Sequence, residues 1–134
     1  FKLSPQENLE ITLNLANVYF LSGDNEQAIN QYNNVIKLSS EKVSDHTALE
    51  LRAQSHASTG VIRYLTRHLS EASTSFAASQ QIHAQLNYKR AEADDLIMLG
   101  SIHVELGEIR NGLNLNLKNE TINLCYFVVI IFTG

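Results

Sequence analysis

The sequence predicts an all-α fold in which antiparallel helix hairpins stack into a repeat domain of about three units, the last of them incomplete. Three observations lead to this prediction. A single proline stands among 134 residues, so long helices can run without the break that proline imposes. Small residues recur along the chain at matched offsets. Residues typical of helix starts precede the amphipathic segments.

The repeat shows in the spacing of small residues. Two series recur at offsets of 44 and then 40 residues: Ala16, Gly60 and Gly100, and Ala28, Ala72 and Gly112. The aromatic residues Tyr32 and Phe76 follow the first offset as well. Small residues let two helices approach closely, and the aromatic side chains fill the space around them. Because the two series shift together, we predict repeated units of two helices each.

The first helix of the first unit is predicted from about Pro5 to Leu21. Ser4 can cap it, Pro5 fits the first helical position, and Glu7 completes a capping box. Residues spaced three to four apart share one face of a helix. The face expected to pack here contains Leu15, Ala16 and Tyr19.

The second helix of this unit is predicted from about Asn25 to Ser39. Gly23 ends the helix before it, and Asp24 can cap the new helix with Gln27 at its third position. The apolar face expected to pack contains Ala28, Tyr32, Val35 and Ile36. Residues 38–44 have weak periodicity and two serines, which indicates a short connection. The first unit therefore spans about residues 5–40.

The second unit is predicted over about residues 45–86 and the third over about 88–118, which gives a repeat domain at residues 1–120. In the second unit, Arg67 and His68 stand where the first unit has its turn glycine. The third unit loses the pattern within its second helix, so we expect that helix to be partial.

The C-terminal residues 121–134 have a different character. They are apolar and rich in β-branched and aromatic side chains, with almost no polar face. Three interpretations stay open: a native helix packed on the preceding unit, a tail translated from an altered reading frame or a retained intron, and a segment embedded in a membrane or a partner. Each interpretation requires a cover for apolar surface that would otherwise promote aggregation.

The residues of the first unit resemble the tetratricopeptide repeat (TPR). The matching positions are Leu15, Ala16, Tyr19, Gly23, Ala28 and Tyr32. The resemblance covers about residues 8–113. Its units are longer than the usual length of about 34 residues, similar to the long-repeat TPRs of kinesin light chains and Pins-type polarity scaffolds. It implies a right-handed superhelix of hairpins, a TPR-like α-solenoid, in which the first helix of each unit lines a concave groove.

The resemblance also implies a function and a site. The implied function is a protein–protein interaction scaffold or adaptor that binds a partner peptide or helix in the groove. The alternative is a sensor domain of a larger regulator that binds a short signalling peptide. The groove positions carried onto this chain are Glu10, Leu13, Asn17, Phe20 and Leu21 in the first unit, Gln54, Ala57, Val61, Tyr64 and Leu65 in the second, and Asp94, Ile97, Ser101, Val104 and Glu105 in the third.

The charge of these positions predicts the class of partner. TPRs that clamp a C-terminal carboxylate need Lys or Arg at several groove positions, whereas here none is basic and only Asn17 matches that clamp. A bound carboxylate would instead meet Glu10, Asp94 and Glu105. An apolar centre with acidic edges suits a segment with Leu, Phe or Met anchors and flanking Lys or Arg.

Composition argues against other classes of function. The net charge is −4, so the chain lacks the basic footprint of nucleic-acid binding. The longest apolar run, at 124–132, is too short for a membrane-spanning helix, which needs about 20 residues.

The single cysteine, Cys125, excludes an internal disulfide framework and suits a reducing compartment, so we expect a cytoplasmic location. The chain begins with Phe1, which suggests a fragment or processed form that is part of a longer chain or assembly.

We found no pattern that predicts an enzyme, a metal site or a cofactor. The five histidines include no pair at i, i+4 spacing, and no H-E-x-x-H, G-x-S-x-G or phosphate-binding glycine loop occurs. Asp94 and Asp95 could suggest acid chemistry, but they fall near the start of a predicted helix, where acidic residues favour the helix dipole.

Overall fold

The described part of the chain folds as a row of five helices. The computed structural model describes residues 2–41 and 45–107, and every regular element in these ranges is helical: α1 (Pro5–Leu21), α2 (Asn25–Glu41), α3 (His46–Leu65), α4 (Leu69–Gln85) and α5 (Lys89–Glu105). The predicted all-α class, with antiparallel hairpins that pack side by side, is confirmed. The partial helix expected after Gly107 and the tail at 121–134 lie outside the described residues.

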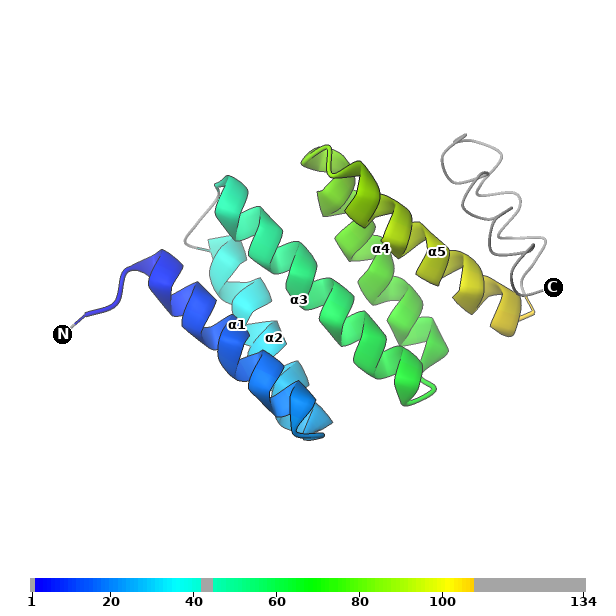
Figure 1. Cartoon of the computed structure of the whole chain (residues 1–134), viewed down its shortest axis with the longest axis horizontal. Helices are drawn as coiled ribbons and strands as arrows, with labels where there is room; N and C mark the ends of the chain where they lie inside the picture. Colours follow the sequence, from blue (N-terminus) through cyan, green and yellow to red (C-terminus); the bar gives the residue numbers. More distant parts are fainter. Residues whose placement is uncertain (1, 42–44, 108–134) are drawn as a thin grey trace.

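The helices form two layers (Figure 1). The first helices of the units, α1, α3 and α5, lie on one side, and the second helices, α2 and α4, lie on the other. Each helix packs against the next one along the chain, and α1 also contacts α3. This arrangement puts every predicted groove position on the layer formed by α1, α3 and α5.

The starts of α1 and α2 are capped by the side chains predicted to do so. The Ser4 hydroxyl accepts a hydrogen bond from the Glu7 backbone N–H, and the Glu7 carboxylate accepts one from the Ser4 N–H, so the capping box is formed. Asp24 accepts from the Gln27 N–H at 3.1 Å. Asp45 caps α3 in the same way. These contacts satisfy donors that a helix leaves unpaired in its first turn.

The turns that follow α1, α3, α4 and α5 share one geometry. Gly23 and Gly107 have φ of +86° and +73°, and Arg67 and Asn87 adopt the same left-handed region at +66° and +61°. After Gly23, the Asp24 N–H donates back to the Tyr19 carbonyl at 2.9 Å, which closes a Schellman turn. The second unit therefore keeps the turn although Arg67 replaces the glycine. An L-residue costs more than glycine in this conformation.

The repeat positions form the core. Ala16, Ala28 and Ala72 are fully buried, and Tyr32 and Phe76 are almost completely buried. Gly60 packs directly on the ring of Phe76, since a Cβ atom added at Gly60 would lie 2.9 Å from the ring atom Cε2. Small residues are thus required where the helices approach most closely. The offset of 44 residues correctly aligned these positions. Gly100, 40 residues after Gly60, is buried as well, whereas Gly112 lies outside the described residues.

Leu15 departs from the prediction. It was expected to pack together with Ala16 and Tyr19, but 39% of its surface is exposed. Its equivalent in the second unit, Thr59, is buried. The reason is positional, because α3 packs against both the helix before it and the helix after it, whereas among the described helices α1 has a neighbour only on the side of α2 and α3.

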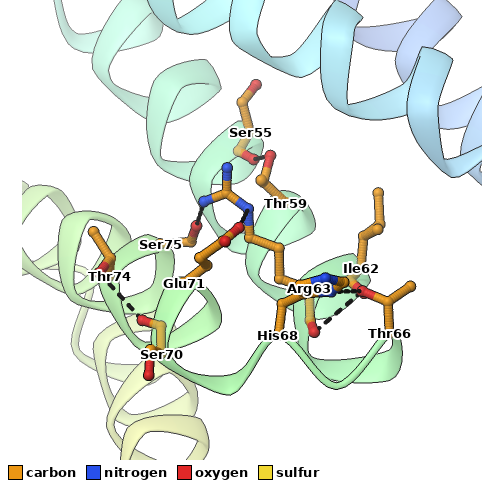
Figure 2. A network of polar contacts seen from close by, with 10 residues as sticks. All are labelled: Ser55, Thr59, Ile62, Arg63, Thr66, His68, Ser70, Glu71, Thr74 and Ser75. Atoms are coloured by element: carbon orange, nitrogen blue, oxygen red, sulfur yellow. Dashed lines mark hydrogen bonds and ion pairs between the residues drawn. The ribbon is translucent and has the colours of Figure 1, made fainter.

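The second hairpin contains a polar network where the first has an aromatic residue. Arg63 stands 44 residues after Tyr19. Figure 2 shows Arg63 reaching from α3 to α4, where its Nη1 donates to the Ser75 hydroxyl at 2.8 Å and its Nε lies 3.5 Å from a Glu71 carboxylate oxygen. A guanidinium with these two partners therefore bridges α3 and α4 at the position of the aromatic wedge.

Candidate functional site

A pocket of about 390 Å³ opens beside α3, next to the connection between α4 and α5. Its lining residues are Glu50, Leu51, Gln54, Ala57, His83 and Tyr88. The first four lie on successive turns of one face of α3. Leu51 and Ala57 provide an apolar wall, while Glu50 and Gln54 provide polar groups. A concave site with mostly apolar walls and a few polar groups is typical of ligand and peptide binding.

Tyr88 joins the two sides of this pocket. Its hydroxyl donates to the Glu50 carboxylate at 2.9 Å and lies 3.2 Å from Nε2 of His46. Its ring makes an edge contact with His46 and stacks over His83, at centroid distances of 5.6 and 6.4 Å. The hydrogen bond to Glu50 is the main cause that raises the pKa of the Tyr88 phenol. The hydrogen bond from Tyr88 thus holds the Glu50 carboxylate at the edge of the pocket.

A buried polar cluster supports the pocket from behind. Asp95 accepts a hydrogen bond from the Ser79 hydroxyl at 2.8 Å, and Nδ1 of His83 lies 2.7 Å from the same carboxylate oxygen. The Asp95 and His83 side chains are only 5% and 13% exposed. This cluster joins α4 to α5 and fixes the orientation of the imidazole that lines the pocket. Burial raises the pKa of Asp95, although the hydrogen bonds from His83 and Ser79 act to lower it.

The raised pKa of Asp95 predicts a pH dependence of stability. A carboxyl whose pKa is higher in the folded state than in the unfolded state favours folding at low pH. That contribution is lost as the pH rises from the ordinary aspartate value of about 3.9 through the raised folded value. We therefore expect the stability of the wild-type chain relative to Asp95→Asn to fall over this range. Urea unfolding of both proteins at a series of pH values measures the difference, and a difference that stays flat or grows with pH would contradict this.

A second pocket, of about 430 Å³, adjoins the first at Tyr88. It is lined by Tyr88, Lys89, Arg90, Ala91 and Asp94. Tyr88 therefore belongs to both pockets and links the N-terminal halves of α3 and α5. The two pockets together offer an extended surface with charges of both signs.

The structure brings only some of the predicted groove positions into these pockets. Gln54 and Ala57 line the first pocket, and Asp94 lines the second. Leu13 is instead buried in the core of the first hairpin. Phe20 packs partly buried against the same core, while the Asn17 amide oxygen accepts a hydrogen bond from the Tyr32 hydroxyl at 2.6 Å.

Three of the remaining groove positions of the second and third units, Val61, Tyr64 and Glu105, make contacts within the protein. Val61 and Tyr64 pack against the core cluster that contains Phe76. The Tyr64 hydroxyl donates to Glu105, whose other carboxylate oxygen lies 2.7 Å from Nη1 of Arg67. Because of these two contacts, the pKa of Glu105 is lowered, chiefly by Tyr64. Glu105 is thus already paired within the protein.

The other groove positions are at least partly exposed. Leu21 and Leu65 are strongly exposed, Glu10 is exposed, and Ile97, Ser101 and Val104 are partly exposed.

Four residues of the first pocket were missed from the sequence: Glu50, Leu51, His83 and Tyr88. Glu50 and Leu51 lie about one turn before Gln54, so a groove extended toward the start of α3 would have included them. Tyr88 belongs to the connection between two units, and His83 belongs to a second helix. The groove positions implied by the TPR resemblance lie only on first helices, so they do not include these two residues.

Within residues 2–41 and 45–107, no three His, Cys, Asp or Glu side chains are grouped so that they could hold a metal ion. Among the described helices, none has the length and apolar character needed to cross a membrane.

Comparisons with protein-family models, with curated proteins and with solved structures give no match for this chain. The resemblance to the TPR therefore rests on the repeat positions of the sequence. The function of this chain is therefore inferred from the two pockets and the side chains that line them.

Proposed function

We propose that this protein is a TPR-like interaction module that binds a segment of a partner protein without catalysing a reaction. The partner lies across α3 and the start of α5, with its main anchor in the pocket beside Tyr88. The function is that of a scaffold or adaptor, and a cytoplasmic location accords with the single cysteine.

The observation that carries this proposal is the pocket lined by Leu51, Ala57 and Tyr88, with the Glu50 carboxylate at its edge. Its volume of about 390 Å³ falls within the usual range of small binding sites, roughly 300–1,000 Å³. Four of its six lining residues lie on the first helix α3, and two of these, Gln54 and Ala57, are positions that the resemblance assigns to the groove. An apolar side chain fits the wall of Leu51 and Ala57.

The charge around the pocket supports a basic–apolar partner. Glu50 retains acceptor capacity because a carboxylate can accept several hydrogen bonds, and the contacts described for it involve Tyr88 and His46. A Lys or Arg beside the apolar anchor would pair with Glu50. Asp94 extends this acidic character toward α5, although Lys89 and Arg90 lie in the same adjoining pocket. Glu105 is already paired to Arg67, so it contributes less to partner attraction than its charge suggests.

Selection from a displayed random-peptide library tests the class of partner. We expect enrichment of peptides with Leu, Phe or Met anchors flanked by Lys or Arg, and we expect acidic C-terminal peptides to be depleted. Binding of the enriched peptides should weaken as salt is raised, because part of the attraction is between exposed charges. Enrichment of acidic C-terminal sequences, or release of a chemically changed peptide, would contradict the proposal.

Glu50→Gln should weaken binding of an enriched peptide by about tenfold, the effect of losing one charge-assisted contact of about 1.4 kcal/mol. Fluorescence anisotropy with the labelled peptide measures the change. Glu26→Gln is the matched control, since Glu26 is an exposed carboxylate on α2, in the opposite layer. Equal affinities of the two variants would show that Glu50 does not take part.

Phe20→Ala combined with Tyr64→Ala should also weaken binding if these aromatic side chains act as anchors. Both side chains pack against core clusters, so their removal also lowers the stability of the fold. Each variant must therefore be compared at a temperature where it is fully folded. Unchanged affinity in the folded double variant would restrict the binding site to the pocket beside Tyr88.

A further inference from the structure

The imidazole of His83 is fixed through its Nδ1 atom. Nδ1 lies 2.7 Å from an Asp95 carboxylate oxygen and 3.3 Å from the Ser79 hydroxyl. The two ring nitrogens of an imidazole are distinct, and they form hydrogen bonds in different directions. Because both contacts use Nδ1, the ring presents Nε2 on the side away from Asp95.

The pocket beside Tyr88 lies on that side of the ring. The His83 side chain is only 13% exposed, yet it lines the pocket, whereas the Asp95 side chain is 5% exposed and lies behind it. The part of the imidazole that reaches the pocket is therefore the edge away from Asp95, which carries Nε2. Tyr88 stacks over the ring, and a stacked neighbour covers a ring face while it leaves the edge available for a ligand.

An anchor without polar atoms suits the walls of this pocket but not His83. Leu51 and Ala57 offer apolar contact, and a volume of about 390 Å³ has room for an aromatic side chain. A Leu, Met or Phe anchor would displace water from Nε2 without replacing its hydrogen bond. A polar atom that loses water and gains no partner costs free energy. The best anchor therefore combines an apolar body with a polar tip.

The chemistry of Nε2 selects among such side chains. Ser and Thr have a hydroxyl but too little apolar surface for the wall of Leu51 and Ala57. The indole of Trp only donates, whereas the phenol of Tyr both donates and accepts. A phenol therefore pairs with Nε2 of His83 whether that nitrogen carries a proton or not. Its ring supplies the apolar body.

We propose that the pocket beside Tyr88 takes a tyrosine side chain of the partner, with its hydroxyl on Nε2 of His83 and its ring against Leu51 and Ala57. The inference rests on the proposed function, since it names the anchor of the same partner segment. A Phe anchor fills the same wall and lacks only the hydrogen bond. His83 thus determines specificity, and Asp95 positions the imidazole without touching the partner.

Two synthetic peptides that differ in one oxygen atom test the proposal. They are acetyl-Lys-Lys-Tyr-Lys-Lys-amide and its counterpart with Phe in place of Tyr. Titration of the ¹⁵N-labelled full chain, followed by the amide shifts of Ala57 and Tyr88, measures both affinities. We expect the Tyr peptide to bind about fivefold more tightly, the effect of one additional hydrogen bond.

His83→Asn isolates the contribution of Nε2. The Asn side chain can still donate to Asp95 in place of Nδ1, but it has no atom at the position of Nε2. We expect the two peptides to bind this variant equally, with the affinity of the Phe peptide unchanged. His68→Asn is the matched control, since His68 is exposed and lines a different pocket at the start of α4. It should keep the preference for the Tyr peptide.

The imidazole ¹⁵N shifts of His83 in the wild-type chain report the same contact without any substitution. We expect the Nε2 shift to move on addition of the Tyr peptide and to stay in place with the Phe peptide. A response that is equal for both peptides, or a Tyr preference that survives in His83→Asn, would overturn the role of His83.

The affinities of the wild-type chain separate this inference from the proposed function. Equal affinities of the two peptides would overturn the tyrosine assignment and leave the proposed function standing. Binding of neither peptide would contradict the proposed function and the tyrosine assignment with it.

Discussion

Phe76→Ala should lower the free energy of unfolding by about 3–5 kcal/mol, the usual cost of deleting a buried aromatic side chain. Phe76 is 2% exposed, packs on Gly60 of α3 and belongs to a cluster with Ala72 and Ile102. Its loss would therefore open a cavity where α3, α4 and α5 meet. Urea unfolding followed by circular dichroism measures the change, and a loss below about 1 kcal/mol would contradict the packing described here.

Gly60→Ala, introduced both into the wild-type chain and into the Phe76→Ala variant, tests the contact between Gly60 and Phe76. In the wild-type chain, the new Cβ would lie 2.9 Å from the Phe76 ring, so strain offsets the gain in helix propensity of about 1 kcal/mol. In the Phe76→Ala background the ring is absent, and we expect that gain to appear. A change in stability that is equal in the two backgrounds would show that the residues are not coupled.

Ala28→Leu and Ala72→Leu should each lower the free energy of unfolding by about 1–3 kcal/mol through overpacking. Both alanines are fully buried at the same position of their units, where a second helix approaches a first helix. Ala84→Leu provides the control, since Ala84 is exposed near the end of α4. Unchanged melting temperatures in both core variants would mean that the repeat alignment is wrong.

Much of the fold could be predicted because its signals are local. Ser4 with Glu7 and Asp24 with Gln27 defined the starts of α1 and α2, since capping depends only on residues within one turn. The alignment of Ala28 with Ala72 and of Tyr32 with Phe76 followed from spacing. The end of α2 was predicted less accurately. The sequence predicts an end at about Ser39, whereas the helix runs to Glu41. Helix ends depend on weak preferences that neighbouring contacts override.

Contacts between units were harder to predict. The left-handed turn at Arg67 persists without glycine because the geometry of the hairpin fixes it. The exposure of Leu15 depends on which element packs beside α1. The spacing of repeat residues along the sequence does not specify that neighbour.

The candidate site was predicted only in part for a similar reason. Gln54 and Ala57 were found because they repeat along first helices, whereas Tyr88 and His83 reach the pocket from a connection and from a second helix. Their proximity to Glu50 arises from the packing of α3 against the α4–α5 hairpin. The units have unequal lengths of 44 and 40 residues, so a connection residue such as Tyr88 has no fixed place in the repeat.

The most direct test of the proposed function locates a bound peptide on the protein. Titration of the ¹⁵N-labelled chain with an enriched basic–apolar peptide, followed by amide chemical shifts, reports which helices respond. We expect the largest changes at Leu51, Gln54, Ala57 and Tyr88, with α2 almost unaffected. Changes concentrated on the outer faces of α2 and α4, or no saturable change at all, would contradict the assignment of the partner-binding site to the layer of first helices.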